Sequence, residues 1–319
     1  MTERELTIVH EHSIDELESL LKESCDLFDN DVHLQREGFG GMSNINIRGH
    51  SNDQEFVLKL PGTHYIQDAA HYKRLHDTSE YYAGRNIAAL PLCRGLLSDR
   101  METPFIIFEY IDGVVQNSLH DFSDRDKILL KECLNNLYST KPPSLRIFNS
   151  PSSFLEENQV FIDSHVGLSS CSQEVFQLNT SFSEILPKVL SYSDSLGTWT
   201  PSVMHGDLWG PNIVIQSKRA VLLDFEACAI GNRFYDFAFL LETEINPSFD
   251  LLPIPLDTDE MNIVSSYRVV ASTYMIIWSI ERLLSMDAGL VEPNLNTKES
   301  WLNFIRWTRP KISRLEEIL

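Results

Sequence analysis

The sequence predicts an α+β protein of two lobes, in which a small β-rich N-terminal lobe precedes a larger and mostly helical C-terminal lobe. Apolar runs typical of strands occur early in the chain, at Ile45–Arg48, Phe56–Leu60 and Phe105–Phe108. Later segments have mostly helical spacing, and the length of 319 residues suits two lobes of one enzyme-sized unit. We expect the lobes at 1–108 and 115–319, with a hinge at 109–114.

The N-terminal lobe is predicted to open with an amphipathic helix over Ile14–Leu27, where apolar residues recur at helical spacing. A glycine cluster follows, and two apolar strands separated by a charged turn then predict a hairpin with Lys59 near the end of its second strand. Two further helices are expected at Gln67–Leu75 and Thr78–Leu90, the second capped by Thr78 or Ser79.

The C-terminal lobe is predicted to be built from helices at Asp126–Tyr138, Phe182–Leu190, Met261–Leu284 and Lys298–Leu319. The segment Pro142–Ser153 is rich in proline and serine and is expected to be a loop. The most apolar helical stretch, Ala271–Ile280, is too short and too polar to cross a bilayer.

Charge and cysteine content restrict the classes of partner and compartment. The chain has 26 basic and 46 acidic residues, a net charge of -20, which disfavours nucleic acids and anionic membranes and favours cationic partners. Its five cysteines include no C-x-x-C pair, and the N-terminus has no signal-peptide pattern, so we expect a reduced, cytoplasmic protein. The sequence does not predict an oligomeric state.

The residues that indicate chemistry lie between His205 and Asp224. Short apolar runs at 213–215 and 221–223 flank a polar turn and predict a tight hairpin, which brings Asn212 beside Asp224. Asp207 lies five residues before Asn212, on a glycine-containing loop that can bend sharply. Two carboxylates and an amide oxygen are therefore expected to converge.

Such oxygens suit Mg²⁺, which takes one or two protein carboxylates and completes its coordination with phosphate and water. The spacing is that of phosphoryl-transfer enzymes, in which an Asp faces the acceptor hydroxyl while an Asn and a second Asp hold the metal. We accordingly assign catalysis to Asp207 and metal binding to Asn212 and Asp224. For His205, a role in holding the loop is favoured over catalysis.

With these residues in place, the chain from Gly38 onward resembles the aminoglycoside phosphotransferase and choline kinase superfamily, small-molecule kinases with a protein-kinase-like fold. The cluster Gly40, Gly41, Ser43 and Asn44 resembles the glycine loop of that family, and Lys59 resembles its nucleotide lysine. The resemblance implies ATP as phosphate donor and Mg²⁺ as cofactor. From the residues alone, the glycine cluster is also compatible with a simple turn, and Lys59 with an edge lysine.

The same resemblance assigns further residues. Glu80 is the candidate ion-pair partner of Lys59, with Asp68 and Asp77 as alternatives, and Glu109 and Ile111 fall where such enzymes bind adenine through the backbone of the hinge. Asp236, in a stretch resembling that of choline kinases, is implied to brace the catalytic loop. The segment 205–209, in contrast, is more similar to ketosamine kinases.

The expected acceptor is a small hydroxyl-bearing molecule that is cationic, such as a choline-like or aminoglycoside-like compound. Aromatic residues could bind an alkylammonium group, although their helical spacing favours a core role for Tyr267, Tyr274, Trp278, Trp301 and Trp307. Glu226 and Glu242 are the candidate acids for an amine. The alternatives are a ketosamine kinase, another enzyme of this fold that phosphorylates a sugar, amino acid or antibiotic, and a silent nucleotide-binding scaffold. A protein kinase is a further alternative, but no counterpart of its Ala-Pro-Glu is evident.

Overall fold

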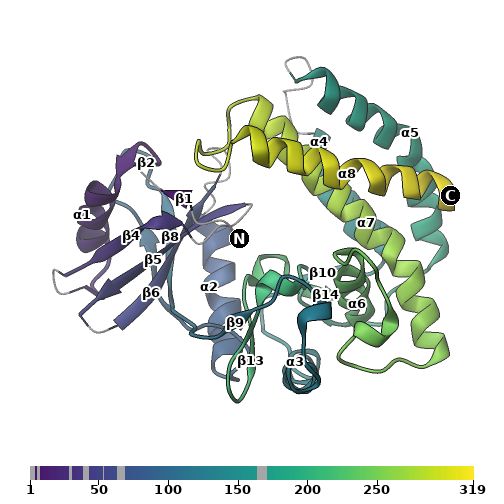
Figure 1. Cartoon of the computed structure of the whole chain (residues 1–319), viewed down its shortest axis with the longest axis horizontal. Helices are drawn as coiled ribbons and strands as arrows, with labels where there is room; N and C mark the ends of the chain where they lie inside the picture. Colours follow the sequence, from purple (N-terminus) through teal and green to yellow (C-terminus); the bar gives the residue numbers. More distant parts are fainter. Residues whose placement is uncertain are drawn as a thin grey trace. The chain divides into compact units, whose positions relative to one another are not determined.

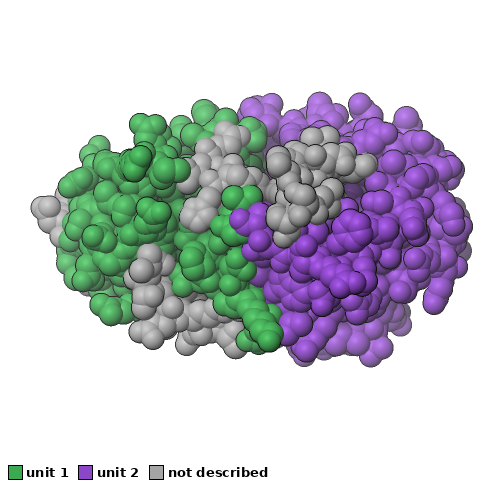
Figure 2. Space-filling view, turned by 90° about the horizontal axis from the view of Figure 1, so that it is seen from above, with its two compact units in different colours: residues 1–112, 289–300 green, residues 113–288, 301–319 purple. Residues whose placement is uncertain are grey.

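The structure is a computed structural model of the whole chain (Figure 1), and it describes residues 4–5, 8–28, 31–38, 43–52, 54–62, 69–163 and 171–319. The chain divides into two units, coloured separately in Figure 2: unit 1 is Met1–Asp112 with Gly289–Ser300, and unit 2 is Gly113–Ala288 with Trp301–Leu319. An antiparallel sheet dominates unit 1 and helices dominate unit 2, which confirms the predicted fold class. No pattern in the sequence indicated that 289–300 would join unit 1.

Unit 1 is built on a six-stranded sheet with the strand order β1-β4-β5-β6-β8-β7. Its elements are β1 (Arg4–Glu5), β2 (Ile8–Val9), β3 (His12–Ser13), α1 (Ile14–Ser24), β4 (His33–Gly38), β5 (Asn44–Ser51), β6 (Gln54–Pro61), α2 (Ala69–Ala83), β7 (Pro91–Leu96) and β8 (Pro104–Glu109). The predicted hairpin is β5 with β6, and the predicted strand at Phe105–Phe108 is β8. Strands β4 and β7 were not anticipated.

The core of unit 1 lies between the sheet and α1. Leu17 and Leu21 of α1 are buried in one apolar cluster with alternate residues of the strands, among them Leu58 and Leu60 of β6. Because side chains alternate across a strand, Lys59 points to the opposite face of the sheet. Figure 1 shows α1 and α2 on opposite sides of this sheet, so Lys59 lies on the α2 face.

One continuous helix, α2, covers most of the first predicted helix and the beginning of the second, so no helix starts at Thr78 or Ser79. Thr78 and Ser79 are buried in the middle of α2, on the same side as Tyr72, Leu75 and Tyr82. The helix ends before Leu90 because Asn86 adopts a left-handed φ of 60°, with its N–H bonded to the Ala83 carbonyl. The cap assignment was therefore wrong.

Two further links hold unit 1 together. Cys25, at the end of α1, forms a disulfide with Cys93 on β7, so the expectation that all cysteines are reduced is wrong for this pair. The 289–300 segment is joined through Glu292, whose N–H donates to the Gly62 carbonyl at 3.1 Å and whose carboxylate accepts the His10 N–H at 3.2 Å.

Unit 2 contains most of the helices and two small three-stranded sheets, with the strand orders β10-β14-β11 and β13-β12-β9. Its elements are β9 (Val114–Val115), α3 (Asp124–Tyr138), β10 (Arg146–Ile147), α4 (Pro151–Asp163), α5 (Gln173–Ser195), β11 (Ser202–Met204), β12 (Ile213–Ile215), β13 (Ala220–Leu222), β14 (Ala229–Gly231), α6 (Arg233–Glu242), α7 (Thr258–Asp287) and α8 (Lys298–Ile318), which begins within the segment that joins unit 1. The helices predicted at 126–138, 261–284 and 298–319 correspond to α3, α7 and α8. That predicted at 182–190 is part of the longer α5.

The segment predicted as a loop at Pro142–Ser153 contains β10 and the start of α4. Pro151 is the first residue of α4, a position at which proline is favourable because no helical partner is lost there. The Ser150 hydroxyl accepts the Ser153 N–H at 3.1 Å and caps this end of the helix. Proline and serine thus start a helix here, which corrects the prediction of a loop.

Helix α7 is the central helix of unit 2, and α4, α5 and α6 all contact it. By length and composition alone it could cross a membrane, yet 67% of its apolar window is buried inside the protein. This burial is what a core helix requires, and it explains why α7 is apolar on several sides.

Candidate active site

The loop at 205–212 follows β11 and is called the catalytic loop because it contains Asp207, the predicted catalytic residue; one buried carboxylate holds it. Asp236 of α6 has no exposed surface and accepts the backbone N–H groups of His205 at 2.8 Å and Gly206 at 2.9 Å, together with the Tyr138 hydroxyl at 3.1 Å. Burial raises the pKa of Asp236 to about 7, whereas these three hydrogen bonds lower it. The contacts agree with the bracing role that the resemblance implied.

His205 connects this loop to the strand that leads to Asp224. Its ring is fully buried, its Nε2 lies 3.0 Å from the Leu223 carbonyl oxygen, and it packs against Phe225 with ring centroids 4.8 Å apart. Burial lowers the pKa of His205 to about 4, so the ring is neutral near pH 7. These contacts support a positioning role for His205 rather than proton transfer.

Gly206 allows the loop to pass close to the segment after Asp224. Its φ is +84°, and a Cβ added there would lie 2.4 Å from the Ala227 carbonyl oxygen. Both the left-handed backbone and the close approach require glycine. The catalytic loop is therefore fixed on one side by Asp236 and on the other by contact with the chain near Ala227.

Asp207 and Asn212 are in direct contact. The Asn212 Nδ2 donates to the Asp207 side-chain Oδ2 and to its main-chain carbonyl, both at 2.9 Å. The hairpin of β12 and β13 pairs Ile213 with Leu222, and the Leu223 N–H donates to the Asn212 carbonyl at 2.9 Å, which places Asp224 beside Asn212. The spacing thus correctly predicts the contact of Asp207 with Asn212 and the place of Asp224 next to Asn212 in the chain fold, while the catalytic and metal-binding roles of these residues stay predictions.

The oxygens left by these contacts fit a hard cation. Because Nδ2 of Asn212 bonds to Asp207, its Oδ1 is the atom available to a metal, and the partly buried Asp224 supplies a carboxylate. The described residues contain no group of three or more His, Cys, Asp or Glu that would form a metal site from protein alone. A site of one carboxylate and one amide oxygen is nevertheless typical of Mg²⁺ bound together with a phosphate substrate.

Tyr274 of α7 lies close to this group of acids. Burial raises the pKa of Tyr274, and the carboxylates of Asp207, Glu226 and Asp224 raise it further. Its ring packs on Phe154 at 5.2 Å and on Phe239 at 6.2 Å. Of the aromatic residues weighed from the sequence, Tyr274 is therefore the one that the structure places near Asp207.

The other aromatic residues mostly belong to the core, as the sequence favoured. Trp278 packs against Phe304 and Trp307 of α8, and the Trp301 Nε1 donates to Asp287 at 3.0 Å. Glu242, considered as an acid for an amine, is 5% exposed and is already paired. Its partners are Arg268, Arg314 and Ser272. Glu242 therefore anchors α8 and is not a substrate acid.

Lys59 is placed by the central strands of unit 1. Its strand β6 lies between β5 and β8, where Lys59 pairs with Asn46 and Ile106, and only 5% of the residue is exposed. A lysine so deeply buried in the middle of a sheet is not an edge lysine that reaches solvent. This position is compatible with a nucleotide role, which stays a prediction.

The glycine loop is only partly described. Gly40 and Gly41 lie outside the described residues, whereas Ser43 and Asn44 lead into β5. Asn44 is 7% exposed and its Oδ1 accepts the Tyr72 hydroxyl of α2 at 3.1 Å. Because Tyr72 belongs to α2, the Asn44 side chain lies on the same face of the sheet as Lys59.

The structure does not join Glu80 to Lys59. Glu80 is exposed on α2, on a different side of the helix from the buried Tyr72, Ser79 and Tyr82, and the described residues show no ion pair between it and Lys59. Asp77, one of the alternatives, binds Lys73 and His76 instead. Glu80 was assigned from its place in the sequence; its exposed position on α2 does not support an ion pair with Lys59, and its nucleotide role stays a prediction.

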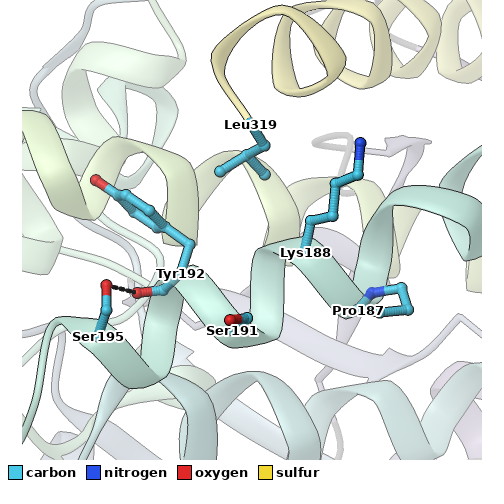
Figure 3. A pocket seen from close by; sticks show the side chains of 6 residues that line it. All are labelled: Pro187, Lys188, Ser191, Tyr192, Ser195 and Leu319. Carbon is cyan, nitrogen blue, oxygen red and sulfur yellow. Dashed lines mark hydrogen bonds between the residues drawn. The ribbon is translucent and has the colours of Figure 1, made fainter.

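Glu109 and Ile111 lie at the end of unit 1. The Glu109 N–H donates to the Leu90 carbonyl at 2.9 Å, and its carboxylate accepts the Leu90 N–H at 2.9 Å. The Glu109 N–H and one of its carboxylate oxygens are therefore already bonded, and an adenine contact at this hinge stays a prediction. A pocket of unit 2 (Figure 3) contains none of the predicted site residues, and is lined by Pro187, Lys188, Ser191, Tyr192, Ser195 and Leu319.

Two residues of unit 2 with notable surroundings were not singled out from the sequence. Tyr138, which donates to Asp236, lies 98 residues from it, and no local pattern links them. Arg282 was hidden in an apolar stretch of α7, where it is 3% exposed. A charged residue at a helical core position was the available signal for Arg282.

The fold and this arrangement of Asp207, Asn212 and Asp224 define a small-molecule kinase with a protein-kinase-like fold. A sequence model of the Phosphotransferase enzyme family matches residues 37–254, more than half of the chain. The chain belongs to this family and is a phosphotransferase that acts on hydroxyl groups of small molecules. No curated protein matches the chain in a sequence search.

Solved structures of similar fold cover nearly the whole chain. A choline/ethanolamine kinase family protein from Mesorhizobium loti has a TM-score of 0.63 at 16% identity, covering 95% of this chain and 93% of its own. Choline kinase LicA from Streptococcus pneumoniae has a TM-score of 0.60 at 15% identity, with 94% and 97% covered. Wild-type aminoglycoside 2'-phosphotransferase-IIIa, in a GDP complex, has a TM-score of 0.61 at 14% identity, with 95% and 99% covered.

Proposed function

We propose that this enzyme transfers the γ-phosphoryl group of ATP, with Mg²⁺, to a hydroxyl of a small amine-bearing alcohol. The observation that carries the proposal is the Asp207 carboxylate held at 2.9 Å by Asn212, on a loop whose backbone is fixed by the buried Asp236. Enzymes of this kind work mainly by positioning and charge neutralisation, so a rigid carboxylate beside metal-binding oxygens is the arrangement they need.

In the proposed step, Asp207 accepts the proton of the acceptor hydroxyl while the hydroxyl oxygen bonds to the γ-phosphorus. The bond from that phosphorus to the β–γ bridging oxygen breaks, and its electron pair leaves with ADP. Asn212 keeps the Asp207 carboxylate in place through Nδ2. Asn212 Oδ1 and Asp224 would hold Mg²⁺, which when bound neutralises negative charge on the phosphate oxygens.

The nucleotide is assigned to unit 1. Lys59 would bind phosphate oxygens together with the loop of Gly40, Gly41, Ser43 and Asn44, and the main chain of Glu109 and Ile111 would bind adenine. The GDP complex of the aminoglycoside enzyme and an AMP complex of LicA support nucleotide use in this fold. Since hinge contacts of this kind are made by the backbone, we propose ATP as the principal donor, with GTP as the alternative donor to be compared.

We assign an amine group to the acceptor because the protein is strongly acidic. The chain carries a net charge of -20, and the partly buried Glu226 lies two residues after Asp224, near enough to raise the pKa of Tyr274. An ammonium group is stabilised in such surroundings and a purely anionic sugar is not. We place the enzyme in the cytoplasm, where ATP is available, and with neither nucleic acid nor membrane as partner.

Ketosamines are the second candidate acceptors, because the segment His205-Gly206-Asp207-Leu208-Trp209 resembles ketosamine kinases. A silent scaffold is disfavoured, because Lys59, Asp207, Asn212 and Asp224 all retain the residue types that transfer requires. A screen of phosphate transfer from ATP to cationic alcohols, aminoglycosides, ketosamines and methylthioribose separates these classes. ATP binding without transfer to any of them would favour the scaffold.

The catalytic assignment is tested by Asp207→Asn. We expect kcat to fall by at least about 1000-fold, since the proton acceptor is lost, while ATP affinity changes by less than about threefold. Steady-state kinetics with the best acceptor and calorimetric titration of nucleotide measure the two effects. Asp194→Asn, at an exposed position on α5, removes the same charge far from the loop and should keep full activity. Full turnover in Asp207→Asn would refute the role of Asp207.

A further inference from the structure

Arg282 on α7 is a buried cation whose hydrogen-bonding capacity is not met by the protein. The residue is 3% exposed, and its Nε and Nη1 atoms are buried without a hydrogen-bond partner among the described residues. A guanidinium presents five N–H donors in a fixed planar arrangement, and buried arginines are rarely left unpaired. The unused donors of Arg282 therefore need an explanation.

The neighbouring acids do not supply the missing contacts. Glu281 precedes Arg282 directly, and adjacent residues on a helix point in different directions. Glu281 is instead bonded by the Ser285 hydroxyl at 3.1 Å, on the next turn of α7. Burial lowers the pKa of Arg282, while the charges of Glu281 and Glu226 raise it. A guanidinium stays protonated in proteins, so the two acids offset its charge without bonding to its Nε and Nη1, which have no acceptor among the described residues.

Two other arginines of unit 2 differ from Arg282 in having a direct carboxylate partner. Arg268 and Arg314 both bind Glu242 directly, at 2.6 Å and at 2.8–2.9 Å, on the opposite part of α7 and on α8. There one carboxylate satisfies two guanidinium groups and joins two helices. Within the part of the chain that the structure describes, Arg282 has no such carboxylate partner, so its contacts are not those of an arginine that anchors helices.

Arg282 and Tyr274 lie on the same helix, α7, and one acid affects the pKa of both. The charge of Glu226, two residues after Asp224, raises the pKa of Arg282 and that of Tyr274, and the charge of Asp207 also raises the pKa of Tyr274. Arg282 follows Tyr274 by eight residues, about 12 Å along the helix axis, and long helical side chains point back towards the N-terminus. The guanidinium is therefore directed along α7 towards the region of Tyr274 and Glu226.

We propose that Arg282 binds a carboxylate group of the acceptor, so that the molecule phosphorylated is an amino alcohol that also carries a carboxylate. This inference rests on the proposed function, because it describes the acceptor of the same site. A carboxylate matches the guanidinium fork with two parallel hydrogen bonds. Glu226 would bind the ammonium group of the same molecule and, with the surrounding acids, would repel an acceptor that is only anionic.

The test uses acceptors that differ only by the carboxylate: ethanolamine against L-serine, and 3-amino-1-propanol against L-homoserine. For the wild-type enzyme, kcat/KM of transfer from ATP should be at least about tenfold higher for the carboxylate-bearing member of a pair. In Arg282→Gln this preference should fall at least about tenfold, while kcat/KM for the simple amino alcohol changes by less than about threefold. Arg306→Gln, which removes an exposed arginine from α8, should keep the preference.

Two outcomes would overturn the inference. One is a wild-type enzyme that uses ethanolamine and 3-amino-1-propanol as well as their carboxylate-bearing counterparts. The other is an Arg282→Gln variant that loses activity on both members of a pair equally. If that variant does not fold, the wild-type comparison of the pairs still decides the matter, and Arg282→Lys, which keeps the charge but not the fork, should retain only part of the preference.

Failure of the proposed function gives a different result. Calorimetric titration of the same pairs into the wild-type enzyme with a non-hydrolysable ATP analogue measures binding without transfer. Selective binding of L-serine or L-homoserine without phosphorylation would support the carboxylate site and refute the phosphotransfer assignment. Transfer confined to the simple amino alcohols would support the phosphotransfer assignment and refute the carboxylate site. Binding of neither member of a pair would also refute the carboxylate site.

Discussion

The catalytic loop of unit 2 and the Lys59 strand of unit 1 present functional groups in two different ways. Asp207 depends on a few identifiable contacts: Asp236 fixes the two residues before it, and Asn212 holds its carboxylate. The position of Lys59 depends on the register of a six-stranded sheet, which many backbone hydrogen bonds maintain together. The loop should therefore fail when one side chain changes, whereas the strand should tolerate changes in its surroundings.

The largest effect is expected for Asp236→Asn, which breaks the loop. The N–H groups of His205 and Gly206 bond to different oxygens of Asp236, and in Asn one of these positions is an NH₂ donor, so one N–H loses its acceptor. Leaving a buried donor unpaired should lower the free energy of unfolding by about 3 kcal/mol, and transfer should fall at least about 100-fold. Urea unfolding and steady-state kinetics measure these changes.

Tyr138→Phe is the matched control for Asp236→Asn. It removes one of the three donors to the carboxylate and leaves both backbone contacts in place, so we expect a loss of only about 1 kcal/mol. Equal stability of the two variants would mean that Asp236 does not hold the loop in the way the hydrogen bonds indicate.

A smaller and pH-dependent effect is expected at His205. Its pKa in the folded protein is about 4, below the ordinary value of 6.5, so the unfolded chain binds more protons between these values. The stability that neutral His205 provides is therefore complete above pH 6.5 and is lost as the pH falls towards 4. The unfolding free energy of the wild type, measured relative to that of His205→Gln, should therefore fall by about 2 kcal/mol between pH 7 and pH 5.

The comparison with His205→Gln is needed because Asp236 acts in the opposite sense. The pKa of Asp236 is raised to about 7, so it favours the folded state more as the pH falls, and this contribution is common to both proteins. Chemical denaturation of both proteins at several pH values gives the difference. A difference that does not change with pH would show that His205 is not held neutral by burial.

The same contrast explains which parts of the site the sequence could predict. Asp207, Asn212 and Asp224 are close in sequence and joined by one hairpin, so their spacing alone predicts their convergence. Tyr138 contacts Asp236 although the two residues are 98 positions apart, and the burial of Arg282 depends on how the helices pack, so local spacing indicates neither. The predicted pair of Glu80 with Lys59 does not occur among the described residues, because the position of an acid in a helix does not give its orientation. Local spacing predicts local geometry, while contacts between elements require the fold.

The smallest effect is expected for Glu80→Gln, which tests the strand side of the contrast. Because Glu80 is exposed and is not paired with Lys59, kcat and the KM for ATP should each change by less than about twofold. Lys59→Met, the positive control on β6, should lower kcat/KM for ATP about 100-fold because a phosphate-binding charge is lost. If Glu80→Gln instead lowers kcat/KM tenfold, then Glu80 reaches Lys59 during turnover, and the lysine depends on a single partner as the catalytic loop does.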